Sequence, residues 1–166
     1  MIIRPAERTD LPTIDDVFRV SFCDTFAHLY SAEDLAAFLN QFTPDAWQAE
    51  HDDPAFAFQV GEQDGVVGYA KLGPNKLPFI DPEGAIELKQ LYLLKRAHGI
   101  GIGRQLMDWV VAEARRRAAV RLVLSVWENN HRAQAFYQRY GFADRGPYEF
   151  MVGKQADRDR IWELVL

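Results

Sequence analysis

The sequence has a single cysteine, Cys23, among 166 residues. One cysteine cannot form an internal disulfide, which is compatible with a reducing cytosol. No apolar run approaches the roughly 20 residues that span a bilayer, and the opening MIIRPAERTD is too polar for a signal peptide. These absences predict a cytoplasmic protein with no membrane partner.

The sequence also lacks the features of metal-binding, repeat-containing, disordered and nucleic-acid-binding proteins. The four histidines have no metal-ligand spacing, so no metal site is expected. There is no internal repeat and no low-complexity linker, and 166 residues favour one domain over 1–166. A hydrophobic content of 48% excludes a disordered chain, and a net charge of −5 argues against a nucleic-acid partner.

Positive charge is absent from residues 20–70, a stretch that contains nine acids. Between Lys89 and Arg121 the balance reverses, with eight basic residues against two acids, Asp108 and Glu113. Two interpretations stay open. The asymmetry reflects chance and solubility, or it places an acidic wall opposite a basic, anion-binding segment.

Hydrophobic periodicity predicts the elements of the first half of the chain. A short strand ends at Pro5, and Thr9 is expected to cap a helix whose apolar stripe starts at Leu11. Ser31 and Thr43 are expected to cap two further helices, the last one short. Strands follow at 55–61 and 66–72, joined by a hairpin at Asp64–Gly65.

The second half continues with a strand at 85–94 and a glycine loop. A helix follows with Ile102, Leu106, Val110 and Ala114 on one face, then a buried strand at 120–126. A helix capped by Asn130 and a final hairpin of YEFMVG and RIWELVL complete the chain. The order β-α-α-β-β-β-α-β-α-β-β predicts an α/β fold with one mixed sheet and helices on both sides.

The glycine loop HGIGIGRQLM, residues 98–107, lies between a strand and a helix and is typical of an anion site. A nucleotide-hydrolysing loop would need lysine and serine or threonine where Arg104 and Gln105 stand. A dinucleotide loop needs Gly-x-Gly-x-x-Gly, which neither Gly99 nor Gly101 begins, although Glu128 could mimic the acid that binds the ribose. The remaining interpretation is a pyrophosphate held by the backbone N–H groups of 99–104.

Two motifs resemble the GNAT superfamily of N-acetyltransferases. LYLLKRAHGIGIGRQLM (91–107) is similar to its acyl-CoA motif, Gln/Arg-x-x-Gly-x-Gly/Ala, except that His98 occupies the first position. NHRAQAFYQRYGF (130–142) is similar to its second motif. VWENNHRAQAFY and the late FMVG also resemble bacterial polyamine N-acetyltransferase-like members. The resemblance implies a GNAT fold with a mostly antiparallel central sheet.

That resemblance implies acetyl transfer from acetyl-CoA to an amine by direct attack in a ternary complex, without a metal. It places cofactor contacts at two groups of residues: Leu91 and Leu93 through their backbone, and His98, Gly99, Ile100, Gly101, Ile102, Gly103, Arg104, Asn130, Ala133 and Tyr137. His98 is shorter than the usual Gln or Arg and only partly protonated near neutral pH, which weakens the expected affinity rather than the cofactor assignment.

The resemblance also implies two catalytic residues. Tyr137 is expected to protonate the leaving thiolate, and its alternative role is that of a core aromatic. Glu87, eleven residues before His98, is expected to act as the base through water, and its alternative is a strand acid paired with Lys89.

The acceptor is expected to be a small cationic, polyamine-like amine or a peptide, because of the acidic stretch. A CoA-binding module without turnover, acting as a sensor or in assembly, is the alternative function. A homodimer is possible by analogy, and no residue pattern indicates an interface.

Overall fold

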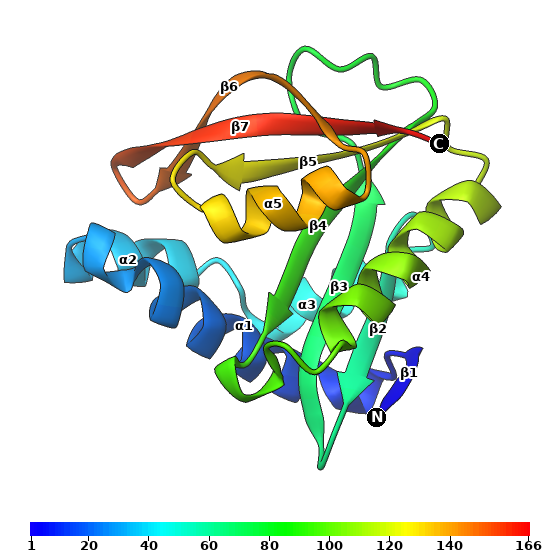
Figure 1. The fold of residues 1–166 in the computed structure, drawn as a ribbon. Coiled ribbons are helices and arrows are strands. Elements are labelled where there is room, and N and C mark those ends of the chain that lie inside the picture. Colours follow the sequence, from blue (N-terminus) through cyan, green and yellow to red (C-terminus); the bar gives the residue numbers. More distant parts are fainter.

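Seven strands form one sheet in the order β1-β2-β3-β4-β5-β7-β6 (Figure 1). The computed structural model describes all 166 residues. Its strands are β1 (Ile2–Pro5), β2 (Ala57–Glu62), β3 (Val66–Pro74), β4 (Ala85–Leu93), β5 (Arg121–Trp127), β6 (Ala143–Val152) and β7 (Gln155–Val165). Neighbours are antiparallel except for β4 and β5, which are parallel. The predicted mixed, mostly antiparallel sheet is confirmed.

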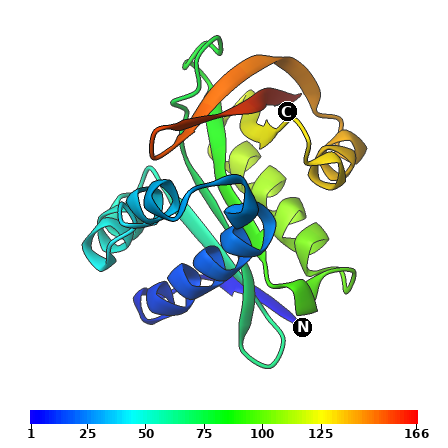
Figure 2. The same cartoon turned by 90° about the vertical axis from the view of Figure 1, so that its left-hand side faces the viewer.

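Helices cover both faces of the sheet (Figure 2). One face carries α1 (Leu11–Phe26), α2 (Ala32–Leu39) and α3 (Pro44–Asp52), which pack on an aromatic-rich core. The other carries α4 (Ile102–Arg116) and α5 (His131–Arg139), which pack on a mainly aliphatic core. The observed order contains one helix more than the predicted order, namely α3. This is the short helix that Thr43 was expected to cap. None of the helices has the length and apolarity needed to cross a lipid bilayer.

Most predicted helix starts are confirmed by hydrogen bonds. The side chains of Ser31, Thr43 and Asn130 accept from the N–H groups of Asp34, Ala46 and Ala133.

Thr9 was the wrong cap. It lies inside a 3₁₀ turn, Arg8–Asp10, and α1 begins at Leu11. Glu7 and Asp10 form a reciprocal capping box instead, and Arg4 donates to the same Asp10 carboxylate at 2.7 Å. This carboxylate caps the 3₁₀ turn, whereas no side-chain hydrogen bond caps α1 itself.

The amphipathic pattern of α4 packs as predicted. Ile102, Leu106, Val110 and Ala114 are all fully buried against the sheet. Gly61 of β2 permits this close approach, because a Cβ there would lie 2.6 Å from Cγ2 of Ile102. The N-terminal end of α4 is therefore held directly over the sheet, with the glycine loop beside it.

The final hairpin is longer than the sequence indicated. The predicted strand RIWELVL begins at Arg160, whereas β7 begins at Gln155 and pairs with β6 over nine residue pairs. The additional residues bring Asp157 and Asp159 into the sheet, both 8% exposed. Their side chains alternate with those of Arg158 and Arg160, as the two-residue period of a strand requires.

Candidate active site

A gap opens between β4 and β5 in the middle of the sheet. The two strands pair only at three positions, the last of which joins Glu87 to Val123. Beyond them the strands diverge, and β5–β7 run across the upper part of the molecule at a wide angle to β4 (Figure 1). A register shift in the pairing with β3 leaves Lys89 without a partner and marks a bulge in β4. One edge of each strand is left free for a ligand.

The glycine loop forms the lower end of this gap with unused hydrogen-bond donors. Gly99 and Gly101 have φ values of 80° and 95°, the left-handed region that glycine adopts without strain. None of the backbone N–H groups from Gly99 to Arg104 donates a hydrogen bond within the chain. Together with the dipole of α4, these donors make a concave site that fits a pyrophosphate.

His98 is held in a single orientation beside the loop. Its Nε2 lies 3.2 Å from the carbonyl oxygen of Leu93, and its Nδ1 lies 3.0 Å from a guanidinium nitrogen of Arg132. Arginine can only donate, so Nδ1 must accept and Nε2 carries the proton. Arg132, which sequence reasoning missed, thus brings a fixed positive charge from α5 to the motif position where His98 lacks one.

The other predicted cofactor contacts surround the same gap. The side chains of Leu91 and Leu93 pack into the α4 core, which leaves their backbone as the available part. Asn130 uses its side-chain oxygen to cap α5 at the N–H group of Ala133, so its amide nitrogen is free. The guanidinium of Arg104 is 81% exposed at the start of α4. The structure therefore brings all these residues to one region.

Tyr137 lies on α5 and packs against Phe136 and Phe142. Its hydroxyl group has no hydrogen-bond partner within the chain. Burial raises the pKa of this phenol well above its usual range, so the group keeps its proton. A protonated, unpaired hydroxyl beside the gap has the chemistry expected of a proton donor, and its role stays a prediction.

Glu87 is buried at the apex of the gap, with 8% of its surface exposed. Its Oε2 accepts from Nζ of Lys89 at 2.6 Å and from the N–H group of Lys76 at 2.9 Å. The ion pair that the sequence allowed as an alternative is therefore present. Oε1 has no partner, and the role of Glu87 as a base stays a prediction.

Two further carboxylates near the gap were missed. Asp157 and Asp159 of β7 point toward the face covered by α1 and α2, and the hydroxyl group of Tyr30 donates to Asp157. Burial, with the charge of Asp157, raises the pKa of Asp159 to about 7. Two acids spaced i, i+2 in a strand were the only signal in the sequence, because such residues lie on the same face.

The acidic stretch does not form the wall that its composition suggested. Glu50 pairs with Lys71, Asp52 with Arg8, and Asp24 with Lys95. Glu62 pairs with Arg4 near the edge of the sheet, and Asp64 lies in the β2–β3 turn. Long-range partners thus neutralise much of this charge and spread it over several elements.

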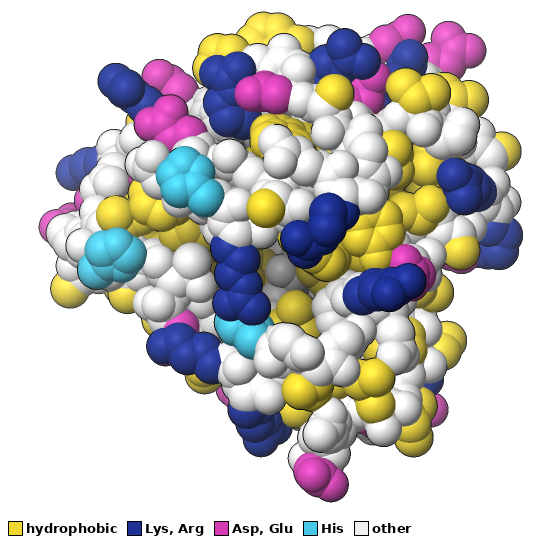
Figure 3. Space-filling view, in the orientation of Figure 1, with side chains coloured by type: hydrophobic (Ala, Val, Ile, Leu, Met, Phe, Trp, Pro, Cys, Tyr) yellow, Lys and Arg dark blue, Asp and Glu magenta, His cyan; other side chains and the backbone are white.

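Basic and acidic side chains are mixed on the face of the molecule seen in Figure 3. Lys, Arg and His side chains are spread over the face that carries α4 and α5, and many acidic ones lie toward its upper margin (Figure 3).

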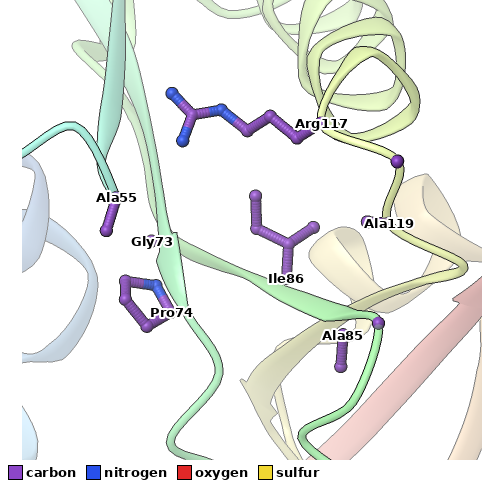
Figure 4. Close-up of a pocket in the computed structure, with 9 residues that line it drawn as sticks. Ala55, Gly73, Pro74, Ala85, Ile86, Arg117 and Ala119 are labelled. Carbon is purple, nitrogen blue, oxygen red and sulfur yellow. The ribbon is translucent and has the colours of Figure 1, made fainter.

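A separate hollow of about 440 Å³ lies at the far end of α4 (Figure 4). Small residues such as Gly73 and Ala119 line it, together with Arg117. The guanidinium of Arg117 already donates to the carbonyl oxygens of Pro54 and Phe56 and to Glu113. Because α4 separates this hollow from the glycine loop, it is not part of the gap.

Residues 17–142 match the sequence pattern of the acetyltransferase (GNAT) family. An uncharacterized N-acetyltransferase of the pepI 3′ region in Lactobacillus delbrueckii subsp. lactis is 32% identical over 99% of this chain and 96% of that protein. A spermine/spermidine N(1)-acetyltransferase of Bacillus subtilis is 28% identical over 64% of this chain and 69% of that protein.

Solved structures share the architecture. The ribosomal-protein-alanine N-acetyltransferase of Brucella melitensis has a TM-score of 0.77 at 26% identity, with both chains fully covered. The PaiA N-acetyltransferase of Thermoplasma acidophilum, in complex with coenzyme A, has a TM-score of 0.76 at 21% identity over 99% of this chain and 98% of that one.

Proposed function

Because the chain belongs to the acetyltransferase (GNAT) family, we propose that it transfers the acetyl group of acetyl-CoA to a primary amine. The observation that carries this proposal is the row of free N–H groups from Gly99 to Arg104 at the start of α4. A pyrophosphate needs several donors in a positive field, and this loop provides both. The gap between β4 and β5 leads from the loop toward Tyr137.

Backbone groups do most of the cofactor binding in this proposal. The pantetheine arm lies along β4 as an added strand would, bonded to the backbone of Leu91 and Leu93. The Leu93 carbonyl already accepts from His98, and its second lone pair can accept again. Arg132 and Arg104 add positive charge beside the phosphates, and Asn130 and Ala133 flank the arm.

Acetyl-CoA supplies the acetyl group as an activated thioester when it is bound. Tyr137 is proposed to donate its phenolic proton to the departing sulfur, which its protonated state allows. A base must take a proton from the attacking amine. Glu87 is the carboxylate that the sequence predicts for this step, with Oε1 as its unbonded oxygen.

For the acceptor we propose a small cationic amine, polyamine-like in its charge. The buried acids at the gap support this choice, and a related Bacillus protein is named for spermine and spermidine. A peptide amine is the second candidate, since a similar structure is named for ribosomal-protein alanine.

The test measures acetyl-CoA binding by calorimetry and then thiol release over a panel of amines. The panel contains spermidine, a monoamine of similar length, a lysine peptide and glutamate. We expect release above background with spermidine at low salt, and a smaller advantage over the monoamine at high salt. A preference for glutamate would contradict the cationic acceptor. Tight acetyl-CoA binding with no turnover on any amine would instead support a CoA-binding module.

A further inference from the structure

We propose that Asp159, in place of Glu87, is the general base of this reaction and that the acceptor enters as an ammonium ion beside Asp157 and Asp159. The inference rests on the proposed function and adds a catalytic residue that the sequence analysis did not single out. It concerns the sheet face opposite α5, where the end of α1 approaches the gap.

Asp159 lies directly opposite Trp127 of β5 and is more than nine-tenths buried. It forms no ion pair with a lysine, arginine or histidine, so no cation within the chain compensates its charge. Ser125, also on β5, is the neighbour that favours its charged form. A buried carboxylate without a counter-ion is unfavourable for folding, and the natural partner for it is a cation that arrives with the substrate.

The carboxylate also lies near the proposed acid. Burial raises the pKa of Tyr92 of β4, and its neighbours Tyr137 and Asp159 raise it further. Tyr137 belongs to a helix on one face of the sheet, whereas Tyr92 packs in the core of the other face. Tyr92 is therefore a neighbour of both groups, and the proposal places the proton donor on one face of the sheet at the gap and the proton acceptor on the other.

Aromatic rings and a second carboxylate complete the place for a cation. Tyr30 holds Asp157 by a hydrogen bond and is stacked on Phe22, with ring centroids 6.1 Å apart. Phe26, at the end of α1, packs edge-on against Trp127 at 5.9 Å. An ammonium between such groups gains from both carboxylates and from ring faces.

The chemistry balances with these groups alone. The ammonium gives one proton to Asp159, and the freed lone pair forms the new C–N bond at the thioester carbon. The C–S bond breaks, its electron pair goes to sulfur, and Tyr137 gives sulfur a proton. The second proton on the attacking nitrogen returns to the Tyr137 oxygen. The products are the N-acetylamine and the free thiol, with the first proton left on Asp159 for release to solvent.

The pH dependence follows from the surroundings of Asp159. The groups that face it come from four strands and two turns: Asp157, Ser125, Glu128, Tyr30, Tyr92 and Tyr148. Burial and the acids among them favour the protonated form, and the pKa is raised to about 7. A base must be ionised, so kcat/KM is expected to rise with pH up to about 7 and then level off.

The test compares pH profiles of kcat/KM with spermidine for the wild type and isosteric variants. Asp159→Asn is expected to lower kcat/KM by roughly 10²–10⁴-fold. It should also remove the limb near pH 7, which is the part of the pH profile where kcat/KM rises with pH, while the affinity for acetyl-CoA stays within two-fold. Asp157→Asn is expected to raise the KM for spermidine, because one of the two carboxylates that bind the ammonium is lost, and to move the limb to lower pH, because the charge of Asp157 helps to raise the pKa of Asp159. Glu163→Gln is the control, since Glu163 shares the strand, the face and the 8% exposure but is bonded to Arg145.

Several results would overturn the inference. One is a limb that persists in Asp159→Asn and disappears in Glu87→Gln, which would make Glu87 the base. Another is a limb unmoved by Asp157→Asn, and this readout remains if Asp159→Asn does not fold. A wild type that binds acetyl-CoA and acetylates no amine at all would remove the proposed function first, and the inference with it.

Discussion

Replacing Asp159 by asparagine is expected to stabilise the fold while it stops the reaction. Asn has nearly the same shape, but it cannot ionise in a place where the anion has no counter-ion. The wild-type protein must keep this carboxylate charged above its pKa, at a cost in folding free energy. A residue that only supported the structure would show the opposite effect when it was changed.

The magnitude follows from the pKa of about 7, compared with an ordinary value of 3.8. The folded state binds this proton more tightly than the unfolded state, so wild-type stability falls from about pH 4 to pH 7 and is constant above. A shift of about three units corresponds to about 4 kcal/mol at most. New partners that the amide needs offset about 1–2 kcal/mol of this. We expect Asp159→Asn to gain about 2–3 kcal/mol at pH 8, and no stability below pH 4.

Urea unfolding at pH 5 and pH 8 measures the difference, and a rise in Tm of roughly 4–12 °C at pH 8 should accompany it. Glu163→Gln is again the control, because it breaks the 3.0 Å contact with Arg145 and is expected to lose stability at both pH values. The reasoning is refuted if Asp159→Asn is less stable than the wild type at pH 8. A stability difference equal at the two pH values would refute it as well.

Three further predictions concern the cofactor side of the gap. Tyr137→Phe is expected to leave the Kd for acetyl-CoA within a few-fold and to lower kcat by roughly 10–1000-fold; single-turnover rates that match the wild type would remove it from the mechanism. Arg132→Ala is expected to weaken acetyl-CoA binding by about 3–10-fold at low salt and less at 1 M salt. Arg139→Ala, at the other end of α5, is the control and should not weaken binding. Equal effects of the two variants in calorimetry would contradict the role of Arg132. Gly101→Val is expected to abolish tight binding because its φ of 95° strains any branched residue, and wild-type affinity would mean that the loop binds something else.

The parts of the site that the sequence predicted are those carried by consecutive residues. The N–H donors of 99–104 and the cap at Asn130 depend on local backbone geometry, so a motif of a few residues is enough to locate them. Arg132 lies inside one of these motifs, yet its contact with His98 joins residues 34 positions apart. No local pattern carries that information.

Asp159 shows why the other residues of the site were not identified from the sequence. QADRD alternates acids with other polar residues, which is typical of an exposed loop or edge, so the strand was expected to begin at Arg160. Asp159 is paired with Trp127 of β5 and Asp157 with Phe150 of β6, and this pairing turns both acids inward. The interpretation of residues 20–70 as an acidic wall was wrong for the opposite reason. Partners that neutralise these acids, such as Lys71 and Arg4, lie outside the stretch in the sequence.

The divergence of β4 and β5 also affects how part of the molecule unfolds locally. Only three residue pairs join the two halves of the sheet, compared with seven in the β3–β4 and β5–β7 pairings. The segment β5–α5–β6–β7 is therefore expected to behave as a cooperative unit of its own, with amides that exchange hydrogen for deuterium through a sub-global opening. A ligand lying in the gap bonds both halves, so its binding free energy adds to the cost of that opening. Acetyl-CoA should then protect amides of β5 that it never touches.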